Sequence, residues 1–233
     1  MKSAGRNKRN RLERCETMYH RVLIKVSGEA LSSEQSVICR ETVLKTANML
    51  KAIHKMGVQI GVVVGGGNIM RGRSAEGMER NRADHMGMLA TAINALALQD
   101  ALEGIGVPCS VQSAVEMERF CDSFSSRAAR SALEEGKVVI FACGSGCPFF
   151  STDTAAALRA AEIGADALLL AKNVDAVYSA DPKTDPKAVK YSQITYDRVV
   201  AENLHATDLT AITLCKEQNI PIRVFALSQI EEV

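Results

Sequence analysis

Residues 58–68 read Val-Gln-Ile-Gly-Val-Val-Val-Gly-Gly-Gly-Asn, a short apolar run that passes directly into three glycines. A strand that is apolar nearly throughout, rather than alternating with polar residues, is typical of a parallel sheet covered by helices on both faces. The glycines expose backbone N–H groups and allow an anion to approach closely. We therefore predict a buried parallel strand followed by an anion-binding turn, with a purely structural tight turn as the alternative.

Similar apolar runs alternate with Ala- and Leu-rich stretches along the rest of the chain. The predicted strands span residues 21–26, 58–64, 107–111, 137–142, 167–170 and 222–225. The predicted helices span residues 42–55, 83–103, 126–135, 152–163 and 208–217. This alternation predicts an α/β fold, a three-layer αβα sandwich with a mainly parallel central sheet. Ligands of such a sheet bind beyond the carboxyl ends of its strands.

The overall composition is that of an ordinary globular protein and excludes several functional classes. The chain has 233 residues, of which 47% are hydrophobic and 24% charged, and this size favours one domain with a sizeable core. Aromatic residues make up only 4% and Trp is absent, which argues against a carbohydrate-stacking module or a single-strand nucleic-acid platform. The apolar runs are far shorter than the roughly 20 residues that cross a bilayer, so no membrane partner is predicted.

The charge distribution and the cysteine content indicate how the chain is divided into domains and in which cellular compartment the protein works. Residues 1–17 carry six Lys or Arg side chains against two Glu, a local net charge of +4 in a chain whose total is +1. We predict a disordered basic leader at residues 1–17 and a single domain at 18–233, with an anion-binding tail as the alternative. The mildly acidic remainder gives no sign of nucleic-acid binding. The seven cysteines include no Cys-x-x-Cys pair, which predicts free thiols in a cytoplasmic protein without a metal site.

Two further junctions place polar residues at the end of a predicted strand. Lys25-Val26-Ser27-Gly28 closes the first strand and puts an ammonium group at the rim of the predicted crevice. Residues 144–153, Gly-Ser-Gly-Cys-Pro-Phe-Phe-Ser-Thr-Asp, precede an Ala-rich helix that Ser151 or Thr152 is predicted to cap. Glycine turns and a helix N-terminus favour a bound phosphate. A solvent-seeking lysine and simple helix capping are the alternatives.

A fourth polar segment follows the strand at 167–170. It contains Tyr178, which offers a stacking face, and Asp181, a loop carboxylate before Pro182. Neither a Walker A motif nor the protein-kinase signature is present. Several phosphate-binding turns on one sheet edge, with Lys and Arg beside them, suit two anionic ligands that meet head-on. We therefore predict phosphoryl transfer, which needs mainly positioning and cations.

Five motifs in this sequence match those of a known family. They are Lys-Val-Ser-Gly-Glu-Ala-Leu at 25–31, Gly-Gly-Gly-Asn-Ile-Met-Arg-Gly at 65–72, Asp-His-Met-Gly-Met-Leu-Ala-Thr at 84–91, Gly-Ser-Gly-Cys-Pro-Phe-Phe-Ser-Thr-Asp-Thr-Ala-Ala at 144–156 and Val-Asp-Ala-Val-Tyr-Ser-Ala-Asp-Pro at 174–182. Together they resemble the bacterial UMP kinases of the amino-acid-kinase superfamily, in order from about residue 18 to 225. The motif at 84–91 and the Pro-Phe-Phe-Ser-Thr-Asp stretch are the most specific.

The resemblance implies the amino-acid-kinase fold and the Mg²⁺-dependent transfer of a phosphoryl group from ATP to UMP by direct in-line attack, a step of pyrimidine nucleotide biosynthesis. It implies three catalytic residues, Lys25, Arg71 and Asp153, of which Asp153 orders the cationic groups. The implied ATP site comprises Lys25, Val26, Ser27, Gly28, Gly67, Arg71, Asn173, Tyr178 and Asp181. The implied UMP site comprises Gly66, Asp84 at the ribose hydroxyls, Ser145, Gly146, Cys147, Pro148, Phe149, Phe150, Ser151 and Thr152.

The same resemblance implies a homohexamer, with GTP and UTP as effectors. The sequence departs from the family at Cys147, where Asn is usual, at Lys172, where Thr is common, and at Thr207, which stands where Met precedes Asp208. The family also continues past the Val-Phe pair at 224–225 with a closing segment that ends near Gly-Thr, which is not found before residue 233. We expect this last difference to affect stability and regulation more than chemistry.

Two other functions remain as alternatives. Another kinase of the superfamily would phosphorylate a carboxylate or carbamate such as acetylglutamate or glutamate, but the Pro-Phe-Phe-Ser-Thr-Asp stretch argues against it. A catalytically silent nucleotide-binding or storage assembly on the same fold is the second alternative. The presence of Lys25, Arg71 and Asp153 together disfavours that reading.

Overall fold

The computed structural model describes residues 19–70, 77–172, 174–182, 184–204 and 207–226, and this part of the chain is built on a seven-stranded sheet. The strand order is β4-β3-β5-β2-β1-β6-β9, and every pairing within it is parallel. The strands are β1 (Arg21–Val26), β2 (Gln59–Val64), β3 (Cys109–Ser113), β4 (Asp122–Ser123), β5 (Val138–Ala142), β6 (Ala167–Lys172) and β9 (Ile222–Ala226). Two short strands, β7 (Val177–Tyr178) and β8 (Lys190–Tyr191), form a separate antiparallel pair.

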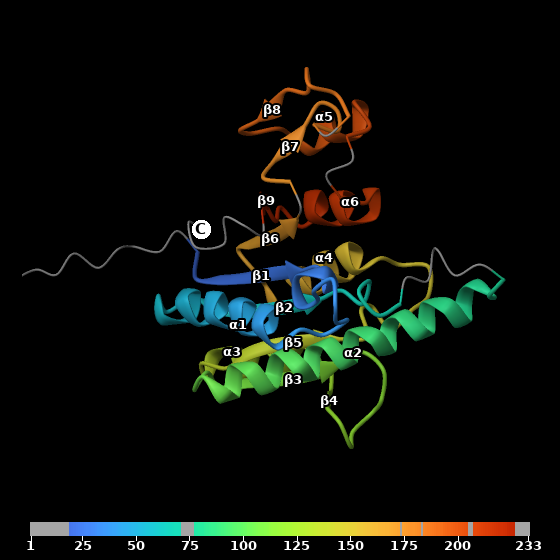
Figure 1. The fold of residues 1–233 in the computed structure, drawn as a ribbon. Coiled ribbons are helices and arrows are strands. Elements are labelled where there is room, and N and C mark those ends of the chain that lie inside the picture. Colours follow the sequence, from blue (N-terminus) through green and yellow to red (C-terminus); the bar gives the residue numbers. More distant parts are fainter. Residues whose placement is uncertain (1–18, 71–76, 173, 183, 205–206, 227–233) are drawn as a thin grey trace, which may run out of the picture.

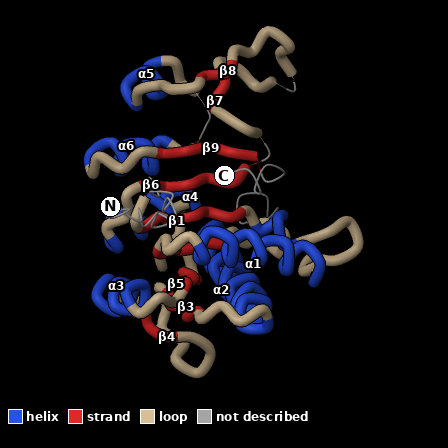
Figure 2. The backbone as a smooth tube through the Cα atoms, turned by 90° about the vertical axis from the view of Figure 1, so that its left-hand side faces the viewer, coloured by secondary structure: helices blue, strands red, loops and turns tan. Residues whose placement is uncertain are grey.

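Helices cover both faces of the sheet, as the apolar strands predict. They are η1 (Gly28–Leu31), α1 (Arg40–Lys55), α2 (Arg80–Gly104), α3 (Ser126–Glu134), α4 (Thr152–Ile163), α5 (Tyr196–Ala201) and α6 (Leu209–Glu217). One core cluster joins α1 and α2 to the sheet, and a second joins α3, α4 and α6 to its other face. Figures 1 and 2 show the resulting three layers, which confirm the predicted sandwich.

Alternation along two central strands decides which side chains face α4. On β1, Val22, Ile24 and Val26 belong to the core beneath α1 and α2, whereas Leu23 belongs to the core beneath α4. On β6, Leu168 and Leu170 also face the α4 side. Successive side chains of a strand point to opposite faces. The next residues in these two series, 25 on β1 and 172 on β6, therefore face the α4 side as well.

The six predicted strands and five predicted helices are all present, with small shifts at their ends. The largest shift is at the predicted helix 83–103, because α2 begins at Arg80. The predicted strand 107–111 also moves, because β3 begins at Cys109. The N–H of Val107 instead donates to Leu102 O at the end of α2, and Pro108 has no N–H to add to a ladder. The prediction lacked η1, α5 and three strands of only two residues each, β4, β7 and β8.

The β7–β8 pair and α5 lie beyond the β9 edge of the sheet, away from the rest of the fold (Figures 1 and 2). A small apolar cluster of Val199, Leu204 and Ile212 connects this part to α6, and Val177 and Tyr191 pack against it. The polar segment that follows the strand predicted at 167–170 thus contains a short antiparallel pair of strands. Among the described residues, no helix is long and apolar enough to span a membrane.

Candidate active site

Four neighbouring strands end at the same place on the carboxyl edge of the sheet. They are β5, β2, β1 and β6, in that spatial order. The chain passes from β1 into Ser27 and Gly28, from β2 into the glycine triplet at 65–67, and from β5 into the loop that ends at Ser151. The fold thus brings together the three junctions that the sequence singles out.

Asp153, in the first turn of α4, lies at the centre of a cluster of four side chains. Its Oδ1 is 2.9 Å from Lys25 Nζ, and its Oδ2 is 2.8 Å from Lys172 Nζ. Thr207 Oγ1 donates a hydrogen bond of 2.8 Å to the same Oδ2. The side chains of Lys25, Asp153 and Lys172 are only 12%, 14% and 21% exposed. Because two ammonium groups share one carboxylate, the cluster carries excess positive charge in a largely desolvated place.

The two lysines control the protonation of Asp153. Burial by itself would raise the pKa of this carboxyl, because the charged form is poorly solvated. The ammonium groups of Lys25 and Lys172 outweigh burial and hold the pKa of Asp153 well below its ordinary value. Asp153 is therefore ionised at neutral pH and fixes both ammonium groups at the carboxyl edge.

Close backbone contacts hold the glycine turn after β2. A Cβ at Gly28 would lie 2.8 Å from Gly65 O, and a Cβ at Gly66 would lie 2.7 Å from Gly87 O. Neither position has room for a side chain. The fully buried amide of Asn94 donates a hydrogen bond of 2.7 Å to Gly65 O and so supports the turn from α2.

The remaining residues expected at ATP near β1 contribute in different ways. The Val26 side chain is buried in the core, so only its backbone faces the site, and its carbonyl accepts a hydrogen bond of 2.9 Å from the N–H of Gly65. Ser27 Oγ donates to the Glu29 carboxylate. Gly67 lines a cavity beside the turn.

That cavity, of about 430 Å³, lies between the glycine turn, α2 and the loop after β5. It is lined by most of the residues expected at UMP: Gly66, Asp84, Ser145, Cys147, Phe150, Ser151 and Thr152. Gly146, Pro148 and Phe149 belong to the same loop without lining the cavity. The structure therefore brings the predicted UMP residues together around one space, beside the cluster at Asp153.

The N-terminus of α4 is fixed by two side chains. Ser151 is its N-cap, as predicted, and its Oγ accepts hydrogen bonds from the N–H groups of Asp153 (3.0 Å) and Thr154 (3.1 Å). Asp208 accepts hydrogen bonds from Ser151 Oγ and, at 2.8 Å, from Thr154 Oγ1. Asp208 also caps α6 through the N–H of Ala211. The two helix N-termini are thus tied together next to Asp153.

The residues expected at adenosine lie on the β7–β8 hairpin and its loop. Tyr178 OH donates a hydrogen bond of 2.7 Å to Asp175 Oδ1, and Lys190 Nζ is 2.6 Å from Asp175 Oδ2. Asp181 lies in the following loop, where its carbonyl accepts hydrogen bonds from the N–H groups of the turn at 184–185. Two further predicted ATP residues, Arg71 and Asn173, lie outside the described residues.

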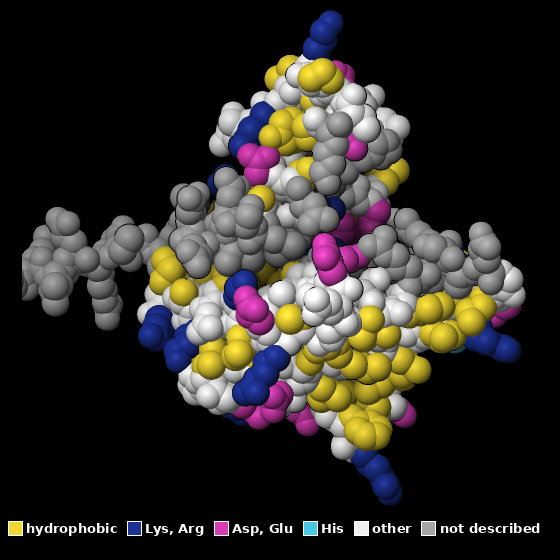
Figure 3. Space-filling model, in the orientation of Figure 1, with side chains coloured by type: hydrophobic (Ala, Val, Ile, Leu, Met, Phe, Trp, Pro, Cys, Tyr) yellow, Lys and Arg dark blue, Asp and Glu magenta, His cyan; other side chains and the backbone are white. Residues whose placement is uncertain are grey.

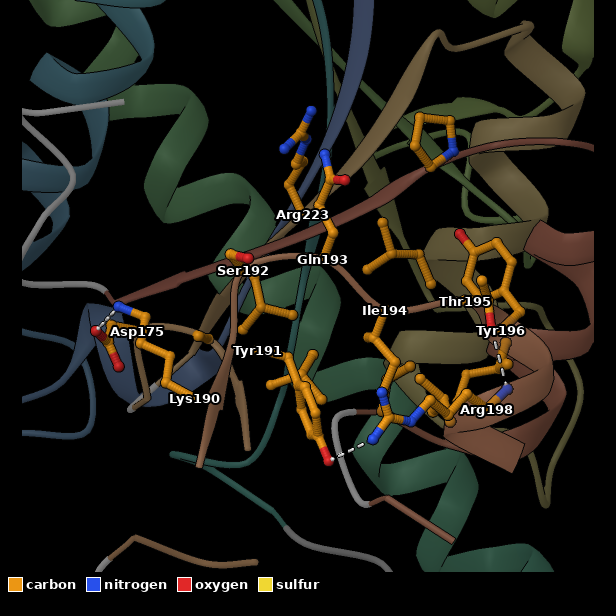
Figure 4. Close-up of a pocket in the computed structure, with 18 residues that line it drawn as sticks. Asp175, Lys190, Tyr191, Ser192, Gln193, Ile194, Thr195, Tyr196, Arg198 and Arg223 are labelled. Carbon is orange, nitrogen blue, oxygen red and sulfur yellow. Dashed lines mark hydrogen bonds and ion pairs between the residues drawn. The ribbon is translucent and has the colours of Figure 1, made fainter. Parts of the chain in front are cut away.

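A second cavity, of about 660 Å³, is lined by residues of β8, α5, α6 and β9 (Figure 4). Some of its polar groups are paired with one another: Arg198 donates to Tyr191 OH at 3.4 Å and lies over the Tyr191 ring. Tyr178 and Asp181 are not among its lining residues, but Thr207 is. Since Thr207 also bonds to Asp153, the larger cavity adjoins the cluster at this one residue. The smaller cavity adjoins it through Ser151 and Thr152, which directly precede Asp153.

Several residues of the site are absent from the predicted set. Lys172 and Thr207 complete the cluster at Asp153, Asp208 ties α4 to α6, and Asn94 supports the glycine turn. The position of Lys172 could have been predicted, because alternate residues of a strand lie on the same face and Leu168 and Leu170 face α4. For the other three, no local pattern indicates which distant residue they contact.

The described residues contain no group of three or more His, Cys, Asp or Glu side chains that could hold a metal ion. Both oxygens of Asp153 face lysine ammonium groups and so do not form an open metal site. This donor set does not fit a resident Mg²⁺ ion.

The profile of the Amino acid kinase family matches residues 20–226, and the chain therefore belongs to this family. It is 50% identical to a uridylate kinase of Pediococcus pentosaceus over 218 residues, which cover 92% of this chain and 90% of the relative. Among solved structures it is similar to the UMP kinase from Ureaplasma parvum, with a TM-score of 0.87, 39% identity and coverage of 91% and 94% of the two chains. The UMP kinase from Bacillus anthracis gives a TM-score of 0.87 at 36% identity, with coverage of 90% and 88%.

Proposed function

We propose that the protein is a UMP kinase, which transfers the γ-phosphoryl group of ATP to UMP and releases ADP and UDP. The uridylate kinase and UMP kinases among its relatives support this activity. The observation that carries the proposal is the position of the positively charged cluster at Asp153 beside the cavity that most of the predicted UMP residues line. Such a cluster suits two phosphate-bearing ligands that meet head-on.

Each of the site residues then has a chemical role. A phosphate oxygen of UMP attacks the γ-phosphorus of ATP, and the bond to the β,γ-bridging oxygen breaks as ADP leaves. Lys25 and Arg71 stabilise the charge on the transferred group, and Asp153 keeps Lys25 in place. Positioning and fixed cations account for most of the catalysis of phosphoryl transfer, so no nucleophile on the protein is needed.

The two nucleotides meet at the cluster in this proposal. UMP lies in the 430 Å³ cavity, where Asp84 takes the ribose hydroxyls and the loop at 145–152 surrounds the phosphate and the base. The ATP phosphates lie over Ser27, Gly28 and Gly67, with the adenosine near Tyr178 and Asp181. Mg²⁺ enters as part of the ATP complex.

The surface of α2 supports self-association, and the resemblance implies that the assembly is a homohexamer. Met86, Leu89 and Ile93 lie on one side of this helix and are 39%, 54% and 48% exposed. Figure 3 shows hydrophobic side chains gathered over α2. A contiguous exposed apolar face is typical of a protein–protein contact, and a second copy of the chain is the proposed occupant.

The remaining parts of the proposal rest on the resemblance and, for the location and the leader, on the cysteine content and the charge of residues 1–17. The protein acts in the cytoplasm, in pyrimidine nucleotide biosynthesis, with GTP and UTP as effectors. Its kinase domain spans residues 18–233 and follows a basic leader at 1–17.

The proposal is tested by an ADP-release assay that offers Mg²⁺-ATP with UMP, CMP, AMP, acetylglutamate or glutamate. ADP formation with UMP alone is expected. Turnover with a carboxylate acceptor would make the protein another kinase of the family. Folded protein that binds nucleotide and releases no ADP with any acceptor would support the silent binding assembly.

A further inference from the structure

Lys172 is the side chain of the cluster that no role so far explains. It is the last residue of β6, and its Nζ lies 2.8 Å from Asp153 Oδ2. Lys25 already neutralises the same carboxylate from β1 at 2.9 Å, and Thr207 donates a further hydrogen bond to it. Asp153 therefore has its charge matched without Lys172.

A purely structural ion pair does not account for this arrangement. Two lysines and one aspartate, all at least 79% buried by side chain, leave one positive charge uncompensated within the cluster. Uncompensated charge in a desolvated place costs free energy unless a counter-ion arrives. Among the described residues, neither ammonium group has another hydrogen-bond or ion-pair partner. Each ammonium group carries three N–H donors, so both retain donors for a ligand.

The sheet register places both ammonium groups on the same side of the molecule. Lys25 pairs in register with Leu170, two residues before Lys172 on the neighbouring parallel strand. Strand alternation then directs 25, 170 and 172 to the α4 face, where the capped N-terminus of α4 adds a favourable field for an anion. The two lysines hold Asp153 from both of its oxygens, so they lie close enough to contact one phosphoryl group from two sides.

We propose that Lys172 is a second cation for the transferred phosphoryl group, working beside Lys25 and held in place by Asp153. The proposal rests on the function proposed above and assigns a residue that contacts the terminal phosphates of ATP. When nucleotide binds, one N–H of Lys172 stays on Asp153 and another donates to a γ-phosphoryl oxygen. The excess charge of the free site is thereby neutralised, and the charge that builds up on the moving group is stabilised.

The test compares Lys172→Met, which keeps the length and removes the charge, with Lys172→Gln and Lys172→Arg. Lys137→Met is the matched control, because Lys137 forms an exposed ion pair with Glu135 ahead of β5 and lies outside the site. For each protein, calorimetry gives the affinity for the β,γ-imido analogue of ATP and for AMP. Kinetics with UMP gives kcat and KM, and thermal unfolding checks the fold.

We expect Lys172→Met and Lys172→Gln to bind the triphosphate analogue at least tenfold more weakly, with AMP affinity changed less than twofold. We expect kcat to fall by about 10²-fold with KM for UMP within threefold, and Lys172→Arg to recover part of both losses. An unchanged kcat and analogue affinity, or equal losses for AMP and the analogue, would overturn the proposal. So would failure of all three variants to fold, because Lys172 would then be a structural residue.

The two proposals fail in distinguishable ways. If the unmodified protein does not phosphorylate UMP, the proposed function fails. The comparison of the triphosphate analogue with AMP still decides whether Lys172 contacts the terminal phosphates, because this measurement needs no acceptor.

Discussion

The carboxylate of Asp84, near the start of α2, accepts a hydrogen bond of 2.8 Å from the backbone N–H of Phe149, 65 residues further along the chain. Arg80 donates to the same oxygen, also at 2.8 Å, and its guanidinium lies over the Phe149 ring. Phe149 has a φ of 71°, which costs free energy for a residue with a side chain. Asp84 therefore holds the loop after β5 at the cavity, and we propose that its other oxygen binds the ribose of UMP.

Asp84→Asn is expected to raise KM for UMP about tenfold or more and to change kcat much less. The asparagine side chain is uncharged, so it is a weaker acceptor for the N–H of Phe149 and for the ribose hydroxyls. A hydrogen bond to a charged group contributes about 1.5–3 kcal/mol. Steady-state kinetics with varied UMP measures the change. Asp100→Asn, an exposed carboxylate near the other end of α2, serves as the control. A KM for UMP equal to that of the unmodified protein would place the nucleoside elsewhere.

Gly66→Ala is expected to destabilise the protein by about 1–3 kcal/mol, a usual range for overpacking, and to lower kcat/KM. The new Cβ would lie 2.7 Å from Gly87 O and 3.0 Å from Ala90 Cβ, so the turn after β2 must move. Gly104→Ala is the control, because a Cβ there meets nothing within 4 Å at the end of α2. Urea unfolding measures both variants. Equal stability of the two would show that the turn tolerates a side chain.

Acidification is expected to remove the stabilising contribution of Asp153. Its pKa is lower in the folded protein than in the unfolded chain, so the contribution is fully present above the unfolded value of about 4. The contribution declines as the pH falls from there toward the lowered native pKa. The free energy of unfolding is measured between pH 7 and pH 2.5 for the unmodified protein and for Asp153→Asn. The variant should lose less stability over this range, and parallel curves would contradict the prediction.

Leu89→Glu combined with Ile93→Glu is expected to reduce the assembly to smaller species. The two side chains are 54% and 48% exposed on α2, and charges placed there would oppose contact with a second copy. Light scattering after gel filtration gives the mass. Val189→Glu changes an equally exposed apolar residue, 59% exposed, outside α2. A hexamer that persists in the double variant would show that α2 is not the contact.

Much of this site follows from local sequence patterns. The apolar runs and the glycines after them are sufficient to predict β1, β2 and β5 and the turns where they end, because buried parallel strands have a distinctive composition. A hydroxyl cap of α4, by Ser151 or Thr152, follows from their position before an Ala-rich segment, and the structure selects Ser151. The roles predicted for Lys25 and Asp153, with Asp153 ordering the cationic groups, come from the resemblance, and the structure pairs the two side chains.

Other features depend on contacts that no local pattern encodes. Thr207 reaches Asp153 only because α6 packs beside α4, and Asp208 bonds to the α4 terminus for the same reason. The β7–β8 hairpin has two residues in each strand, too few to show any periodicity. A strand register is likewise needed before Lys172 can be placed next to Lys25.

The most direct test of this account measures UDP formation from UMP and Mg²⁺-ATP by phosphorus NMR, for the unmodified protein and for Lys25→Ala. The side chain of Asp153 keeps Lys172 and Thr207 as partners in this variant, so the fold should be retained. The account predicts UDP and ADP in equal amounts from the unmodified protein, and a rate lower by at least about 10²–10³-fold in the variant. No UDP from the folded unmodified protein, or a near-equal rate in Lys25→Ala, would contradict it.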